Sequence, residues 1–264
     1  MIFFNIHFFL LQINTNVRII TQEVTMDKIE VVDIKKYLKN SKFIGVGTTA
    51  ICFLMPNGKV AKIFYDMPGS SDFYIDRFEK MSSYGNDTFI TPQELLIKDG
   101  KLIGYTYPYI DAKTLKFTSP FVKIDDFLSN YETYLKDAKS FSESLFVPSD
   151  LHGGNILYDH GKCFIIDLDR GRTYNDPNLV YKMNAKRFMT SYMNKIFKAN
   201  LDQLINFYNF YLQRDYVNTN WTNMNEVSNF FDYLYQCVGK SSPTIHDIRV
   251  KHLAYKEIDE YHKY

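Results

Sequence analysis

The central segment of the chain is Phe146-Val-Pro-Ser-Asp-Leu-His-Gly-Gly-Asn-Ile-Leu-Tyr-Asp-His-Gly-Lys-Cys-Phe-Ile-Ile-Asp-Leu-Asp-Arg-Gly171. Two apolar, β-prone runs, 156–158 and 163–166, flank the turn-forming residues 159–162, which predicts a β-hairpin. Each strand has polar residues at one end. Because a hairpin places those two ends side by side, the polar residues before the first strand should meet those after the second.

The polar residues at that edge are mostly oxygen donors. Asp150, His152 and Asn155 precede the first strand, while Asp167 and Asp169 follow the second. Carboxylates a few Å apart repel one another strongly at reduced dielectric, so their convergence implies a counter-cation. Mg²⁺ takes oxygen ligands, keeps some of its waters and commonly bridges to phosphates. The pattern predicts a magnesium site. The alternative, a surface hairpin with acidic turns, leaves the order and spacing of these residues unexplained.

The order Asp-Leu-His-Gly-Gly-Asn, followed by Asp-Leu-Asp, resembles the catalytic loop and metal-binding segment of the protein-kinase-like superfamily. It is most similar to the aminoglycoside, choline and lipopolysaccharide-sugar kinase branches. The resemblance implies that Asp150 orients the acceptor hydroxyl and accepts its proton. It also implies that Asn155 and Asp167 hold Mg²⁺ on the phosphates of ATP.

Three features depart from the protein-kinase pattern. His152 stands where eukaryotic protein kinases have lysine, and would either hydrogen-bond the γ-phosphate or brace the loop. Asp169 replaces the glycine of Asp-Phe-Gly, and would bind a second Mg²⁺ or support the first ligands. Pro148 and Ser149 replace the His-Arg pair before the catalytic aspartate, so the usual brace of that loop is absent.

The earlier part of the chain fits the small lobe of such a kinase. Residues 42–54 and 59–65 predict three antiparallel strands separated by glycine-containing turns. The resemblance implies that Gly45 and Gly47 let backbone N–H groups close over the nucleotide phosphates. It further implies that Lys62 reaches the α- and β-phosphates. The alternative for Lys62 is an ordinary solvated lysine, which its apolar neighbours disfavour.

A kinase lysine needs an acidic partner on the following helix. Residues 72–84 have a helical pattern with Glu79 near the middle, so Glu79 is the predicted partner of Lys62. Glu94 is the fallback, and an exposed glutamate is the alternative for Glu79.

The fourth and fifth strands are predicted over 93–98 and 101–110, and a helix that caps the small lobe over 29–40. Register alone places the adenine contacts at the carbonyl of Pro108 and the N–H of Ile110.

The remainder of the chain is predicted to be helical. Apolar periodicity indicates helices over 121–145, 176–198, 201–213, 225–238 and 244–261, with Tyr and Phe stripes that form core contacts. Only residues 170–177 separate the metal-binding segment from the next helix, which leaves no long peptide-docking segment. The acceptor could therefore be a small molecule or a glycan, and a protein Ser/Thr stays open.

Composition sets limits on the class of protein. The chain has 264 residues, 45% of them hydrophobic, and a net charge of +1 from 31 basic and 30 acidic residues. No global field favours nucleic acid or an anionic membrane. Cys52, Cys163 and Cys237 lie in apolar runs and are typical of buried thiols in a reducing cytosol. The apolar run 1–13 is too short to span a bilayer; an over-extended reading frame before Met26 is favoured over a weak membrane anchor.

The sequence thus predicts an α+β, two-lobed protein-kinase-like fold. Residues 1–25 are an uncertain extension, 26–110 an N-lobe with a five-stranded antiparallel sheet and one main helix, and 111–264 a mostly helical C-lobe. The expected function is a cytoplasmic, ATP- and Mg²⁺-dependent phosphotransferase acting on a hydroxyl acceptor, without nucleic-acid partners or stable membrane insertion. The alternatives are a pseudokinase-like nucleotide-binding module and a scaffold that binds no nucleotide.

Overall fold

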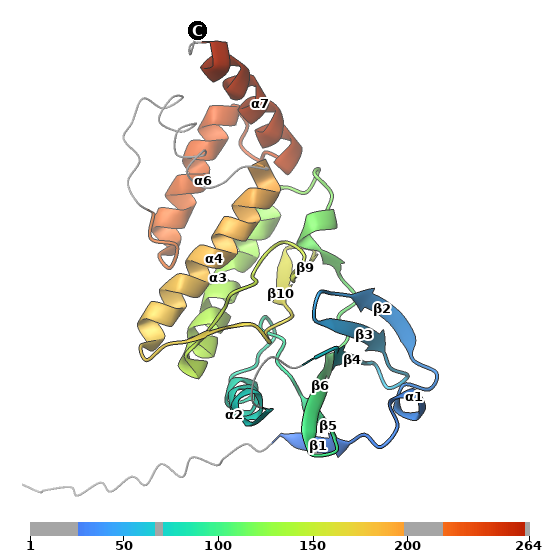
Figure 1. The fold of residues 1–264 in the computed structure, drawn as a ribbon. Coiled ribbons are helices and arrows are strands. Elements are labelled where there is room, and N and C mark those ends of the chain that lie inside the picture. The colour runs from blue at the N-terminus through green and yellow to red at the C-terminus, as the bar shows by residue number, and fades with distance from the viewer. Residues whose placement is uncertain (1–25, 67–70, 198–218, 262–264) are drawn as a thin grey trace, which may run out of the picture.

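The structure is a computed structural model that describes residues 26–66, 71–197 and 219–261. It has an N-terminal sheet and a more helical C-terminal part (Figure 1). The N-terminal elements are β1 (Asp27–Glu30), α1 (Ile34–Tyr37), β2 (Lys42–Val46), β3 (Ala50–Leu54), β4 (Lys59–Phe64), α2 (Ser71–Ser82), β5 (Glu94–Lys98) and β6 (Lys101–Pro108). The C-terminal elements are β7 (Lys113–Thr114), α3 (Ile124–Phe141), β8 (Phe146–Pro148), β9 (Ile156–Asp159), β10 (Lys162–Ile165), β11 (Gly171–Thr173), α4 (Pro177–Phe197), α6 (Met224–Val238) and α7 (Ile245–Tyr261).

The N-terminal sheet has six strands in the order β1-β5-β6-β4-β3-β2. The five predicted strands are confirmed as antiparallel neighbours, but β1 adds a parallel pairing with β5, so the sheet is mixed. Of the helix predicted over 29–40, only Ile34–Tyr37 is helical, and the first two residues of that range belong to β1. The Asp33 side chain accepts hydrogen bonds from the backbone N–H groups of Lys35 and Lys36 and starts only a four-residue helix. Asn40, at φ 66°, lies beyond its end.

The two faces of β4 have different environments because successive side chains of a strand point to opposite faces. Ala61 and Ile63 pack with Val31 and Leu96 in a small cluster on one face. Lys62 points to the other face, where its ammonium lies 5.8 Å from the Tyr105 ring centroid. Tyr105 in turn contacts Phe78 of α2 at 5.2 Å between ring centroids. Lys62 is therefore directed toward the main core, and its side chain is almost completely buried.

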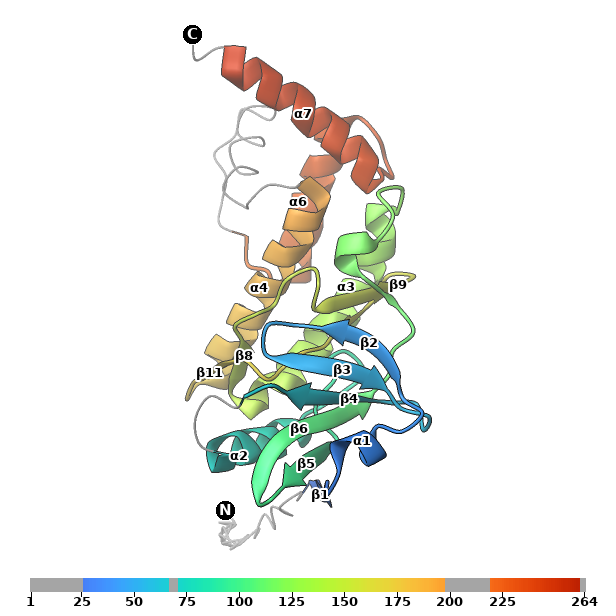
Figure 2. The ribbon, with the colours of Figure 1, turned by 45° about the vertical axis from the view of Figure 1, so that its right-hand side comes forward.

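The C-terminal part is built on the pair α3 and α4, with α6 and α7 beyond it (Figure 2). The predicted helices over 121–145, 176–198, 225–238 and 244–261 are confirmed, whereas the helix predicted over 201–213 lies outside the described residues. The aromatic stripe of α3 is core, as predicted: Phe127, Tyr131 and Tyr134 are buried, and Phe127 stacks on Tyr192 of α4 with ring centroids 3.4 Å apart.

The central hairpin is confirmed as β9 and β10, with Ile156 paired to Ile165. Its two-residue loop, His160-Gly161, has positive φ at both residues (45° and 89°), as a type I′ turn requires. The backbone of Ile165 also exchanges hydrogen bonds with the segment after α2, through Thr88 O and Ile90 N–H. The hairpin is thereby tied to the N-terminal part of the chain.

Gly161→Ala tests this turn, because a Cβ at Gly161 would collide with the Asp126 carbonyl oxygen in addition to facing a positive φ. We expect it to lower the free energy of unfolding by about 2–4 kcal/mol, the sum of left-handed strain and overpacking. Gly58→Ala is the matched control, since Gly58 has φ +79° but nothing within 4 Å of its Cβ position. Urea denaturation of both variants measures the difference, and equal losses would contradict the predicted collision.

Three expectations concern cysteines, membranes and domains. Cys163 and Cys237 are buried free thiols, while Cys52 is partly exposed. Across the described ranges, no helix is long and apolar enough to cross a bilayer. The apolar run 1–13 lies outside those ranges, and the domain boundary after residue 110 stays a prediction.

Candidate functional site

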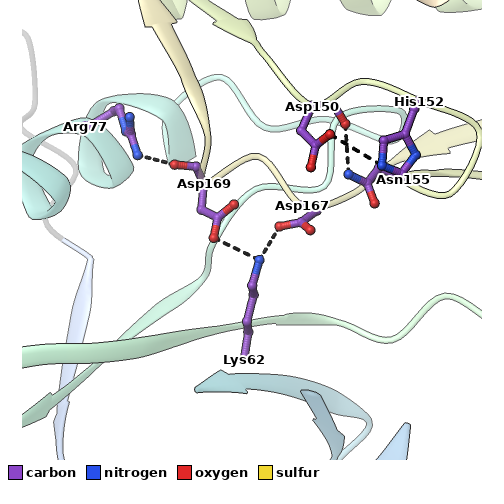
Figure 3. A network of polar contacts seen from close by, with 7 residues as sticks. All are labelled: Lys62, Arg77, Asp150, His152, Asn155, Asp167 and Asp169. Atoms are coloured by element: carbon purple, nitrogen blue, oxygen red, sulfur yellow. Dashed lines mark hydrogen bonds and ion pairs between the residues drawn. The ribbon is translucent and has the colours of Figure 1, made fainter. Parts of the chain in front are cut away.

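The site is centred on the Lys62 ammonium, which contacts two carboxylates from a distant part of the chain (Figure 3). Lys62 Nζ donates a hydrogen bond to Asp169 Oδ2 at 2.8 Å and another to Asp167 Oδ1. Lys62 comes from β4, whereas both aspartates follow β10, more than 100 residues later. The structure thus brings together the lysine and the acidic segment to which the family resemblance gives a common role.

The backbone after the hairpin sets the direction of the Asp167 carboxylate. The Ile166 N–H donates to the Asn155 carbonyl at 3.0 Å, which holds the start of this segment against the loop before β9. Asp167 itself has φ 65°, in the left-handed region that aspartate and asparagine tolerate better than most residues. From this conformation its side chain reaches Lys62.

Two buried carboxylates share one ammonium, and their pKa values move apart. Burial, followed by the charge of Asp167, raises the pKa of Asp169 to about 6. For Asp167, burial acts in the same direction, but the Lys62 charge and hydrogen bonds outweigh it and lower the pKa. Burial would lower the pKa of Lys62, yet the two aspartates together raise it. Two carboxylates carry more negative charge than Lys62 alone neutralises, and the Arg77 guanidinium, which interacts electrostatically with Asp169, is a second cation nearby.

Arg77 of α2 also belongs to the site, although it was not among the predicted site residues. Its Nη2 donates to the Asp169 carbonyl oxygen, and its guanidinium lies 4.5 Å from the Tyr74 ring centroid. Burial lowers its pKa. One feature of the sequence could have indicated Arg77: it lies in a predicted helix with aromatic residues at positions 73, 74 and 78, and an arginine can stack on such rings.

The predicted pairing of Glu79 with Lys62 is wrong. Glu79 Oε1 lies 3.2 Å from Lys28 Nζ of β1, and the fallback, Glu94, lies 2.6 Å from Lys59 Nζ. The reason is helical geometry: two residues apart on a helix correspond to a rotation of about 200°, so if Arg77 faces Asp169, Glu79 faces away. Lys28 lies in β1, a strand whose last two residues fall within the helix predicted over 29–40.

The loop from Asp150 to Asn155 is held by its own hydrogen bonds. Asn155 Nδ2 donates to the Asp150 carbonyl at 2.8 Å, and the Gly154 N–H donates to His152 Nδ1 at 2.9 Å. Because Nδ1 accepts a hydrogen bond, a neutral His152 carries its proton on Nε2, which lies 3.4 Å from Asp150 Oδ1. The Asp150 carboxylate is about half exposed and is not part of the Lys62 cluster.

A brace for this loop comes from α4, which the sequence analysis did not foresee. Arg187 Nη1 donates to the Pro148 carbonyl at 2.5 Å, and Ser191 Oγ donates to the Leu151 carbonyl at 2.6 Å. These two contacts hold the backbone at both ends of the segment from Pro148 to Leu151 against α4. They join residues about 40 positions apart, so no local pattern in the sequence could have revealed them.

Four other residues, besides Lys62 and Glu79, were predicted to take part in nucleotide binding, and they lie near the β2–β3 turn and at or just after the end of β6. Gly45 lies in β2 opposite Cys52, with nothing within 4 Å of a Cβ position. The Gly47 N–H donates to the Ala50 carbonyl at 2.8 Å and closes the β2–β3 turn, so this N–H is already hydrogen-bonded. The closing of this turn over the phosphates stays a prediction. Pro108 ends β6 opposite Lys59, and the Ile110 carbonyl accepts from Ala112 N–H at 3.0 Å. These contacts leave the adenine assignment of Pro108 and Ile110 a prediction.

The oxygen atoms near Asp167 supply some, but not all, of the ligands that the predicted magnesium site would need. Among the described residues, no three His, Cys, Asp or Glu side chains lie close enough together to hold a metal ion. The predicted convergence of three carboxylates is therefore reduced to two, because Asp150 faces His152. Asn155 Nδ2 donates a hydrogen bond to the Asp150 carbonyl, so Asn155 Oδ1 stays available as a metal ligand. Two carboxylates, one carboxamide oxygen and phosphate oxygens suit Mg²⁺, which needs few protein ligands.

The site thus combines a buried ammonium, two carboxylates of different proton affinity and a neighbouring loop with a half-exposed Asp–His pair. Ammonium and carboxylate groups in this arrangement can hold an anionic substrate together with a hard cation. The chain matches no model of a known protein family and no curated protein.

Proposed function

We propose that the protein is a kinase that transfers the γ-phosphoryl group of ATP to a hydroxyl acceptor, with Mg²⁺ as cofactor. The observation that carries this proposal is the contact of Lys62 with Asp167 and Asp169, next to the Asp150–Asn155 loop. These residues have the roles implied by the resemblance to protein-kinase-like enzymes. The sheet followed by a more helical part is the arrangement that a two-lobed kinase would have.

In this mechanism the protein acts by position and charge, without a covalent intermediate. Lys62 would bind α- and β-phosphate oxygens, and Asp169 and Arg77 would keep the lysine and the acidic segment in place. Asn155 and Asp167 would hold Mg²⁺, which neutralises charge on the β- and γ-phosphates when bound.

Asp150 would align the acceptor hydroxyl. The hydroxyl oxygen forms a bond to the γ-phosphorus while the bond from that phosphorus to the β–γ bridging oxygen breaks, and ADP leaves. The proton of the hydroxyl passes to the Asp150 carboxylate and then to solvent. His152 Nε2–H, 3.4 Å from Asp150 Oδ1, would orient this carboxylate.

A pseudokinase-like nucleotide-binding module is the second candidate. It is favoured by the pairing of Lys62 with both aspartates, since such a lysine must exchange partners before it binds phosphate. In that case nucleotide would bind without transfer.

The test has two stages. Thermal unfolding is first measured with Mg-ATP and with ATP plus a chelator; a shift that requires Mg²⁺ is expected, and Asp167→Asn should abolish it. Asparagine is chosen because it tolerates φ 65° as aspartate does. γ-Labelled ATP is then incubated with the protein and a cell lysate, and label in protein or in small molecules is expected. Mg²⁺-dependent binding without transfer would favour the second candidate, and no binding would reject both.

A further inference from the structure

A cavity of about 630 Å³ lies between the Asp150–Asn155 loop and α4. Ser149 and His152 line it from the loop, and Lys186, Arg187, Thr190 and Asn194 line it from the helix. Its volume is in the range of pockets for small organic ligands. Asp150 does not itself line the cavity, but His152 does, and His152 Nε2 lies 3.4 Å from Asp150 Oδ1. A molecule that contacts His152 in this cavity would therefore lie close to the proposed catalytic carboxylate.

The charge of the cavity wall is positive. Lys186 and Arg187 line it, whereas no aspartate or glutamate is among its described lining residues. Lys186 is exposed, and its ammonium has no carboxylate partner in the described part of the chain. Arg187 donates one N–H to the Pro148 carbonyl, which orients the guanidinium. Its other N–H groups can donate to a ligand. Two adjacent cations without a counter-charge favour an anionic ligand.

We propose that this cavity binds the phosphoryl acceptor, and that the acceptor is a small hydroxyl compound carrying an anionic group, either a phosphate or a carboxylate. The inference rests on the proposed function. Lys186 and Arg187 bind the anionic group, Thr190 and Asn194 hydrogen-bond hydroxyls, and one hydroxyl is directed to Asp150. The same charges disfavour cationic acceptors such as aminoglycosides and choline.

Binding in the absence of nucleotide tests the cavity separately from catalysis. The probes are glucose 6-phosphate, glucose and glucosamine, which share one ring and differ in charge, and their affinities are measured by ligand-observed NMR titration. Glucose 6-phosphate should bind at least about tenfold more tightly than the other two. An affinity for glucosamine equal to or above that for glucose 6-phosphate would overturn the proposal, as would no binding of any probe at millimolar concentration.

Variants of α4 locate the interaction. Lys186→Gln should weaken glucose 6-phosphate binding about tenfold, and Lys186→Arg should restore most of it. Lys182→Gln is the matched control, because Lys182 is an exposed lysine one turn earlier on α4 and does not line the cavity. Equal affinities of Lys186→Gln and Lys182→Gln would place the anion elsewhere and reject the proposal.

Failure of this inference and failure of the proposed function can be told apart. The titration contains no ATP, so a loss of phosphoryl transfer does not alter its outcome. Conversely, Mg²⁺-dependent ATP binding depends on Lys62 and Asp167 and not on Lys186, so that shift should be the same in Lys186→Gln as in the unchanged protein. A Mg-ATP shift without acidic-acceptor binding would reject the cavity assignment alone.

Discussion

Asp150→Asn is expected to lower phosphoryl transfer about 10²–10⁴-fold while leaving the affinity for Mg-ATP near that of the unchanged protein. The Asp150 carboxylate faces His152 and solvent and lies outside the Lys62 cluster, so it should contribute to transfer more than to nucleotide binding. Its carbonyl oxygen, which accepts from Asn155, is kept in the variant. Initial rates with saturating ATP and a nucleotide titration measure the two quantities separately.

The chain offers a matched control in a second Asp–His pair. Asp159 Oδ1 lies 2.5 Å from His160 Nδ1 at the tip of the β9–β10 hairpin, exposed to solvent. Asp159→Asn removes a carboxylate of the same kind at the other end of β9, so transfer should be unchanged. If Asp150→Asn weakened Mg-ATP binding as much as it lowered transfer, the carboxylate would be a nucleotide or metal contact, and its assignment as the base would be wrong.

Most of the features that the sequence predicted correctly are fixed by neighbours in the chain; the approach of Lys62 to Asp167 and Asp169, more than 100 residues apart, is the exception and followed from the family resemblance. The β9–β10 hairpin depends on a turn in which His160 and Gly161 have positive φ, and the pattern Asp-His-Gly-Lys contains that information locally. The buried face of α3 follows from apolar spacing in the same way. The presence of Lys62 in an apolar strand was also enough to mark it as unusual.

The errors concern contacts between distant segments. β1 forms only because β5 offers an unpaired edge for parallel pairing, which the helical spacing of 29–40 cannot reveal. Whether Glu79 can reach Lys62 depends on which side of α2 faces the acidic segment. Arg77, two positions earlier on the helix, faces that segment, and Glu79 contacts Lys28 instead. The brace from Arg187 similarly depends on how α4 packs against the loop. Such choices are made by tertiary packing, which local periodicity does not encode.

Lys62→Met should lower the free energy of unfolding by about 3 kcal/mol. In the described structure Lys62 is the only side chain that forms ion pairs with Asp167 and Asp169, so the variant leaves two largely buried carboxylates unpaired. The expected loss is at the low end of the range for a broken buried pair, since the Asp167 side chain is 34% exposed and water can screen it. Lys59→Met is the matched control: Lys59 lies in the same strand and pairs with Glu94 at 2.6 Å, but both side chains are more exposed than Lys62 and Asp169. That variant should lose less than about 1 kcal/mol.

The pH dependence of Lys62→Met identifies the carboxylate responsible. The pKa of Asp169 is raised to about 6 even with Lys62 present, whereas in the unfolded state it is about 4. The contribution of Asp169 to stability is therefore lost as the pH rises from about 4 to about 6 and stays lost above that range. Without the ammonium the pKa should rise further, so the loss of stability should be large at about pH 8 and smaller at about pH 5. Adding Asp169→Asn to Lys62→Met removes one unpaired charge and should restore stability at about pH 8. A loss that is independent of pH, or a double variant no more stable than Lys62→Met, would mean that Lys62 stabilises the fold by packing on Phe64 and Tyr105 and not by charge.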